Sequence, residues 1–257
     1  MPELLYCRDE FTDAPGKPLL LIHGLFGAAE NLMGIARAFE DRPVSLVDLR
    51  NHGRSFHADS MTQMEMAEDI LRLLDAKGWE NVDVLGHSLG GKVALQLSQL
   101  APERINRLVV ADIAPVDYKP HHQLILEALD AVDTSVIKSR SEADKVMSEY
   151  VEEAGIRSFL LMNLVRSQEG GFQWRCNLEG LRANYESIRC APEFKQAFKG
   201  PSLYIRGGNS DYVLDAYQAE IDRFTPEAII QTIEGCGHWL HAEKPVDFNR
   251  LAKDFLG

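Results

Sequence analysis

Short, mostly apolar runs recur along this chain of 257 residues, and helix-length amphipathic stretches separate them. Such runs are typical of strands that are buried on both faces of a parallel sheet. They occupy residues 18–22, 44–47, 82–85, 108–111, 202–205 and 228–233, and helical spacing occurs at 32–39, 64–77 and 92–100. Strands that alternate with helices imply crossover connections and helices on both faces of the sheet. The sequence therefore predicts an α/β fold with a mostly parallel central sheet.

The segment between the runs 108–111 and 202–205 breaks this alternation. It has no buried-strand run, and helical spacing occurs at 122–132, 142–152, 156–164, 178–185 and 192–198. We expect the two flanking strands to be neighbours, so the segment is an insertion at the edge where parallel sheets bind ligands. The predicted organisation is a core formed by residues 1–117 and 201–257 with a helical cap at 118–200. Ordinary helices on the sheet faces are the alternative.

Charge and cysteine content exclude several classes of protein. The 27 Lys+Arg against 39 Asp+Glu residues give a net charge of −12, which argues against nucleic acid and anionic membranes as partners. No apolar run approaches the roughly 18 residues of a membrane span, and the N-terminal pattern is not that of a signal peptide. The cysteines are widely spaced, so we expect reduced thiols, no metal site and a cytoplasmic location. They are Cys7, Cys176, Cys190 and Cys236.

The strongest motif is G-H-S-L-G at residues 86–90, which matches G-x-S-x-G. The predicted strand 82–85 precedes it and the predicted helix 92–100 follows it, as a nucleophile elbow requires. The elbow lifts the Ser88 hydroxyl above the sheet, and its two glycines let the strand and the helix pass closely. Cys236, close to a histidine, is a weaker candidate nucleophile. An ordinary glycine-rich turn is the structural alternative.

A serine hydroxyl needs a base to take its proton. His238 follows the last predicted strand, so it lies at the same sheet edge as Ser88 and is the predicted base. His241 is expected to neighbour the site. His52 and a solvated pair at the start of the insertion, His121 and His122, are rivals.

Two carboxylates could orient His238, because both follow strands at the same edge. Asp112 follows the strand 108–111, and Asp211 follows the strand 202–205 in G-G-N-S-D. The residues alone leave this choice open. For the developing oxyanion we expect two backbone amides, those of Leu89 and Leu25, with Phe26 as the alternative to Leu25.

Six motifs occur in an order that resembles the YbfF-type esterases, a branch of the α/β-hydrolase superfamily. They are H-G-L-F-G at 23–27, D-L-R-N-H-G-R-S at 48–55, G-H-S-L-G-G-K at 86–92, D-I-A-P-V at 112–116, G-G-N-S at 207–210 and G-H-W at 237–239. The resemblance implies an α/β-hydrolase fold and a cytoplasmic, cofactor-independent serine hydrolase of carboxylic esters or acyl-CoA thioesters. It also implies Asp112 as the acid of a Ser-His-Asp triad, while Asp211 keeps the second option present.

Two other functions use the same residues differently. A C–C bond hydrolase or cofactor-free lyase would keep the triad and act on an acidic metabolite, with cations supplied by Lys92, Arg157, Arg166, Arg175 or Arg182. A non-catalytic ligand receptor is the third hypothesis. An apolar acyl tunnel could be lined by Phe159, Leu160, Phe172, Trp174 and Tyr185, unless these form the core of the cap. The sequence does not fix the oligomeric state or the acyl length.

Overall fold

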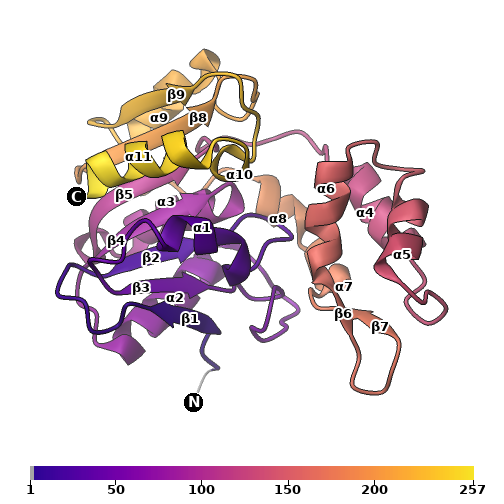
Figure 1. Cartoon of the computed structure of the whole chain (residues 1–257). Helices are drawn as coiled ribbons and strands as arrows, with labels where there is room; N and C mark the ends of the chain where they lie inside the picture. Colours follow the sequence, from indigo (N-terminus) through magenta and orange to yellow (C-terminus); the bar gives the residue numbers. More distant parts are fainter. Residues whose placement is uncertain (1–2) are drawn as a thin grey trace.

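The apolar runs form the centre of one seven-stranded sheet in the computed structural model, which describes residues 3–257 (Figure 1). The strand order is β1-β3-β2-β4-β5-β8-β9, and of these strands β1 alone is antiparallel to its neighbour. The α/β fold class is therefore confirmed. The strands are β1 (Cys7–Glu10), β2 (Leu19–Ile22), β3 (Val44–Val47), β4 (Val82–His87), β5 (Ile105–Ala111), β8 (Ser202–Gly207) and β9 (Ile229–Ile233).

Alternating side chains of the central strands face two helical layers. Leu20 and Ile22 pack in the cluster that contains apolar residues of α2, α3 and α9, whereas Leu19 and Leu21 pack with α1 and α11. The elements outside the sheet are η1 (Ala29–Leu32), α1 (Met33–Ala36), α2 (Gln63–Lys77), α3 (Leu89–Leu100), η2 (Pro102–Arg104), η4 (Asp215–Tyr217), α9 (Gln218–Phe224), α10 (Leu240–Glu243) and α11 (Pro245–Leu256). Within residues 3–257, no helix has both the length and the apolar character needed to cross a membrane.

The insertion, residues 118–200, joins the neighbouring strands β5 and β8 and gathers beside the sheet (Figure 1). Its elements are α4 (Gln123–Ala131), α5 (Arg140–Met147), α6 (Ala154–Leu160), η3 (Leu161–Asn163), β6 (Leu164–Arg166), β7 (Phe172–Trp174), α7 (Leu178–Ala183) and α8 (Tyr185–Arg189).

Two differences from the predicted all-helical pattern change the architecture of the insertion. The helix expected to reach residue 164 ends earlier, and β6 and β7 form an antiparallel hairpin whose turn contains Gly170 and Gly171 at positive φ. The helix predicted at 192–198 is wrong. There, the side chains of Gln96 and Gln99 accept backbone N–H groups of residues 193, 195 and 196, so α3 holds this segment in an irregular conformation.

Strand register brings the motifs to one edge of the sheet. Ile22 pairs with Gly86, His87 with Ala111, and Ala111 with Ile205. The loops that follow β2, β4, β5 and β8 therefore begin at the same level, at the carboxyl ends of parallel strands.

Candidate active site

Ser88 stands in a sharp turn between β4 and α3. Its backbone has φ 53° and ψ −119°, a strained conformation for a residue other than glycine, which costs on the order of 1–3 kcal/mol. A Cβ atom at Gly86 would lie 2.2 Å from the Gly90 carbonyl oxygen, and one at Gly90 would lie 2.2 Å from that of Ile22. Both motif glycines are therefore required by close backbone packing, and the turn has the geometry of a nucleophile elbow.

His238, in the loop between β9 and α10, links two of the predicted side chains. Its Nε2 atom lies 3.0 Å from Ser88 Oγ, and its Nδ1 atom lies 2.8 Å from Asp112 Oδ2. Since a carboxylate only accepts, Nδ1 carries the proton and the Nε2 lone pair faces the serine hydroxyl. The His87 ring, fully buried beside it, donates from Nε2 to the His238 carbonyl oxygen at 2.9 Å and fixes the backbone of this loop.

The structure places the two candidate acids differently. Asp112 is fully buried, and its carboxylate accepts the Gly207 N–H at 2.9 Å and the Ser210 hydroxyl besides the His238 ring. Asp211 is exposed, and its carboxylate makes no hydrogen bond or ion pair with the described residues. Asp112 alone is thus in a position to orient His238. The G-G-N-S segment takes part through Ser210, a contact that the sequence analysis did not find.

The loop 23–27 lies beside Ser88 and contains the predicted amide donors. The backbone N–H groups of Leu25 and Leu89 have no hydrogen-bond partner among the described residues, and both residues line a cavity of about 30 Å³ that also contains Ser88. The Phe26 N–H, by contrast, donates to His52 Nε2 at 3.2 Å. The alternative donor Phe26 is therefore engaged by His52, whereas the amides of Leu25 and Leu89 have no partner in the part of the chain that the structure describes.

Two buried histidines hold the loop 23–27 in place. His23 donates from Nδ1 to the Gly24 carbonyl at 2.8 Å and accepts the Leu49 N–H at 3.1 Å. Burial lowers the pKa of His23 to about 4 and that of His52 to about 3, so both rings are neutral at neutral pH. His52, a rival for the role of base, is thus a support of this loop.

A larger cavity of about 240 Å³ opens at Ser88 and His238. Among the described residues its wall contains no Asp, Glu, Lys or Arg side chain, and its apolar part includes Phe26, Leu32, Ile125, Ile156, Phe159 and Leu160. Three of the further histidines in the wall, His87, His122 and His241, have pKa values below the ordinary range because they are buried. The cavity is therefore suited to an uncharged, apolar group.

Known proteins resemble this chain in both sequence and structure. A family model described as alpha/beta hydrolase fold matches residues 17–135. The chain is 40% identical to mouse sn-1-specific diacylglycerol lipase ABHD11, covering 95% of this chain and 82% of that protein. It is 39% identical to esterase YbfF of Escherichia coli, covering 93% and 92% respectively. The solved structure of a marine microorganism esterase matches with a TM-score of 0.95 at 35% identity, covering 99% of this chain and all of that one.

The chain belongs to the α/β-hydrolase family. The predicted α/β-hydrolase fold and the prediction of an ester-hydrolysing enzyme are both confirmed by these relatives. Within the described chain, this α/β hydrolase has no group of three or more His, Cys, Asp or Glu side chains that could hold a metal ion.

None of the cations considered for an acidic substrate lines the larger cavity of this α/β hydrolase, but Lys92 lines the smaller cavity together with Ser88. Lys92 is buried and donates to three backbone carbonyl groups, those of Val116, Arg189 and Cys190, at 2.5 to 3.0 Å. The arginines have partners as well: Arg157 pairs with Asp144, Arg175 with Glu30, Arg182 with Asp130, and Arg166 lies over the Phe172 ring.

The remaining candidates are divided between the site and the core. His122 is not a solvated side chain as predicted, because it lines the larger cavity and its Nδ1 atom lies 2.8 Å from the Tyr185 hydroxyl. Phe159 and Leu160 also line this cavity, whereas Phe172 and Trp174 belong to the apolar core.

The rival nucleophile lies elsewhere. The Cys236 thiol is buried, burial raises its pKa, and it contacts the Ile233 carbonyl oxygen at 3.3 Å.

Proposed function

We propose that this α/β hydrolase is a serine esterase in which Ser88, His238 and Asp112 act as a triad. The observation that carries the proposal is the continuous pair of contacts through His238, 3.0 Å to Ser88 Oγ and 2.8 Å to Asp112 Oδ2. Ser88 Oγ attacks the acyl carbon of the ester while His238 Nε2 takes the hydroxyl proton. The Asp112 carboxylate keeps the ring in the required tautomer and stabilises the imidazolium ion that forms.

The proposed reaction then passes through a tetrahedral intermediate. The free amides of Leu25 and Leu89 donate to its oxyanion, a contribution of about 2.7–4 kcal/mol for one such donor. The imidazolium protonates the leaving alcohol as the C–O bond breaks, which leaves an acyl group on Ser88. A water molecule attacks this acyl-enzyme with His238 again as base, and the carboxylic acid and free Ser88 result.

We propose neutral esters with an apolar acyl group as the substrate class, and thioesters as a second leaving-group class. The absence of Asp, Glu, Lys and Arg side chains from the described wall of the larger cavity supports this choice. The mouse relative is named for the hydrolysis of diacylglycerol, a neutral ester. We further propose that the insertion, residues 118–200, acts as a cap, because Ile125, Ile156, Phe159 and Leu160 of this segment line the cavity.

The proposal is tested by treating the purified protein with a fluorophosphonate probe and locating the adduct by peptide mass spectrometry. We expect stoichiometric labelling of Ser88 and none in Ser88→Ala. Label on another residue, or no label in a folded protein, would reject the triad.

A rate comparison then tests the substrate class. It uses p-nitrophenyl butyrate, butyryl-CoA and an anionic diketone, and faster turnover of the diketone would favour C–C bond hydrolysis instead. That alternative has little support, because Arg157, Arg175 and Arg182 are in ion pairs and the Lys92 ammonium group is bound by backbone carbonyl groups.

We also propose that the enzyme acts in the cytoplasm. All four cysteines are unpaired, as expected for a reducing compartment. Fractionation of cells that express the chain at its natural level tests this location.

A further inference from the structure

The loop 23–27 contains a tight turn in which Phe26 occupies an unfavourable conformation. The Gly27 N–H donates to the Gly24 carbonyl at 2.9 Å, which makes residues 24–27 a β-turn. Phe26, at the third position of this turn, has φ 60°, where glycine or asparagine is favoured. A bulky residue holds such a backbone only when its surroundings impose it.

This turn determines where the Leu25 amide points. In a trans peptide, the Gly24 carbonyl and the Leu25 N–H point in opposite directions. The Gly24 oxygen accepts from Gly27 N–H and from the His23 ring, so the Leu25 N–H is directed away from both of them. If Phe26 relaxed to a negative φ, either the peptide between Leu25 and Phe26 would turn over or the turn would open, and both changes would displace the Leu25 backbone.

Phe26 is held through both of its backbone polar groups. Its N–H donates to His52 Nε2 at 3.2 Å, and its carbonyl accepts Asn163 Nδ2 at 2.7 Å. The two partners come from different parts of the fold, since His52 follows β3 in the core and Asn163 ends η3 in the insertion.

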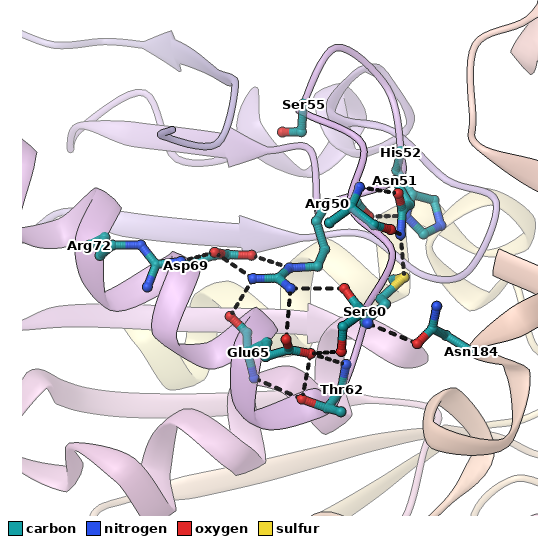
Figure 2. A network of polar contacts seen from close by, with 12 residues as sticks. Arg50, Asn51, His52, Ser55, Ser60, Thr62, Glu65, Asp69, Arg72 and Asn184 are labelled. Atoms are coloured by element: carbon teal, nitrogen blue, oxygen red, sulfur yellow. Dashed lines mark hydrogen bonds and ion pairs between the residues drawn. The ribbon is translucent and has the colours of Figure 1, made fainter. Parts of the chain in front are cut away.

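A second hydrogen bond fixes the tautomer of His52, so that its Nε2 atom accepts the Phe26 N–H. Its Nδ1 atom donates to the Arg50 carbonyl at 3.0 Å, and the Arg50 side chain is anchored by Asp69 and the Ser60 carbonyl (Figure 2). The hydrogen bond from the Phe26 N–H to His52 is therefore supported by a buried polar network around Arg50.

The surroundings of Asn163 indicate that its main role is the hydrogen bond to the Phe26 carbonyl. Its side chain is 2% exposed, and its Oδ1 atom has no hydrogen-bond partner in the described chain. A buried amide oxygen without a partner is destabilising, so an apolar side chain would serve better if position 163 only packed. The Nδ2 atom also approaches the Leu160 carbonyl at 3.4 Å, a longer contact than that to Phe26.

We propose that Asn163 and His52 are positioning residues that hold Phe26 from two sides and thereby direct the Leu25 amide toward the oxyanion. In this view the insertion completes the oxyanion site as well as covering the cavity. The inference rests on the proposed function, because it assigns the Leu25 amide to the ester reaction.

The test compares Asn163→Ala with Asn184→Ala. Asn184 also joins the insertion to the core, since its side chain accepts the Met61 N–H at 2.9 Å (Figure 2). It also donates to the Asp59 carbonyl and makes no hydrogen bond to the loop 23–27 within the described chain. We expect Asn163→Ala to lower kcat by about 10-fold or more, because a misdirected oxyanion donor loses most of its effect. KM should stay within about twofold of the wild-type value, and Asn184→Ala should keep kcat within the same range.

A transition-state readout separates positioning from structural damage. A trifluoromethyl ketone forms a tetrahedral adduct with an oxyanion, whereas the matched methyl ketone binds largely as an intact carbonyl. We expect Asn163→Ala to raise the inhibition constant of the first by the factor lost in kcat and to leave that of the second unchanged.

His52→Phe removes the acceptor of the Phe26 N–H. It should also lower kcat with KM nearly unchanged and weaken the binding of the trifluoromethyl ketone only, so it provides a second test if one variant does not fold. Unchanged kcat in both variants, or an equal loss in Asn184→Ala, would overturn the inference. Absence of ester hydrolysis in the wild-type enzyme would instead overturn the proposed function.

Discussion

The Tyr212 ring lies parallel to the His238 imidazole, with ring centroids 3.9 Å apart and an angle of 18° between the planes. Its backbone is fixed on both sides, since its N–H donates to Ser210 Oγ and its carbonyl accepts the Tyr118 hydroxyl. Tyr212 directly follows Asp211 in the sequence. The segment 207–212 therefore supports His238 through the Tyr212 ring, although the Asp211 carboxylate does not contact it. The stack restricts rotation of the imidazole, and an aromatic face stabilises the imidazolium ion that the proposed reaction forms.

Tyr212→Leu should therefore lower kcat for p-nitrophenyl butyrate by about 2- to 30-fold, the range that about 0.5–2 kcal/mol of cation–π energy gives. Tyr212→Phe keeps the ring, loses only the hydroxyl contact with His121, and should stay within about twofold of the wild-type rate. Equal losses in the two variants would show that the hydroxyl matters and the stack does not. Steady-state kinetics at saturating substrate measures the difference.

The two candidate acids give a second prediction. Asp112→Asn should reduce kcat by about 10⁴-fold, because the amide no longer holds the required tautomer of His238. Asp211→Asn should change kcat by less than about twofold, since this carboxylate is exposed and does not contact the ring. A large loss on substituting Asp211 would mean that the acid reaches His238 by a rearrangement. Both variants are compared with the wild type by kcat and by fluorophosphonate labelling.

The fold was predictable where burial leaves a continuous pattern. Residues 44–47 and 82–85 belong to strands that pair with a neighbour on each side, and their sequences directly predict buried strands. Cys7–Glu10 was missed because β1 is a half-exposed edge strand rich in charge, and its pairing with β3 is a long-range contact. The hairpin in the insertion was missed for a related reason, since each strand has only three residues.

The sequence predicts which residues follow strands at one edge of the sheet, but it does not predict the direction in which their side chains point. Ser88 and His238 follow strands that end at one edge, and the structure brings them within hydrogen-bond distance. Asp112 and Asp211 satisfy the same positional rule, so only coordinates distinguish a carboxylate that faces His238 from one that faces solvent. Asn163 was not identifiable, because its contact with Phe26 joins residues 137 positions apart.

The network beside the loop 23–27 gives a prediction for stability. Arg50 binds Asp69 through two hydrogen bonds of 2.6 and 2.9 Å, and the Asp69 side chain is 1% exposed (Figure 2). Asp69→Ala leaves the guanidinium buried without its main partner and should lower the free energy of unfolding by about 3–5 kcal/mol.

Two comparisons in urea unfolding test this assignment. The double variant Arg50→Met with Asp69→Leu should lose clearly less stability than Asp69→Ala, because no buried charge remains. Glu220→Ala, which breaks an exposed pair with Arg223, should cost at most about 1 kcal/mol. A small effect of Asp69→Ala would show that water reaches Arg50.

Acid should destabilise this enzyme through its buried neutral histidines. Burial lowers the pKa of His23 to about 4, of His52 to about 3 and of His241 to about 4, against 6.5 in the unfolded chain. The unfolded state therefore binds more protons below pH 6.5, and the free energy of unfolding falls as the pH decreases from about 6.5 to about 4, by roughly 2 kcal/mol per group at pH 5. His241→Leu removes one such group and should weaken the decrease between pH 7.5 and pH 5 by about that amount in urea unfolding. His57→Leu, at an exposed position, is the matched control and should leave the decrease as it is in the wild type. An equal decrease in all three proteins would contradict the lowered pKa, because it would show that His241 binds a proton as readily in the folded as in the unfolded state.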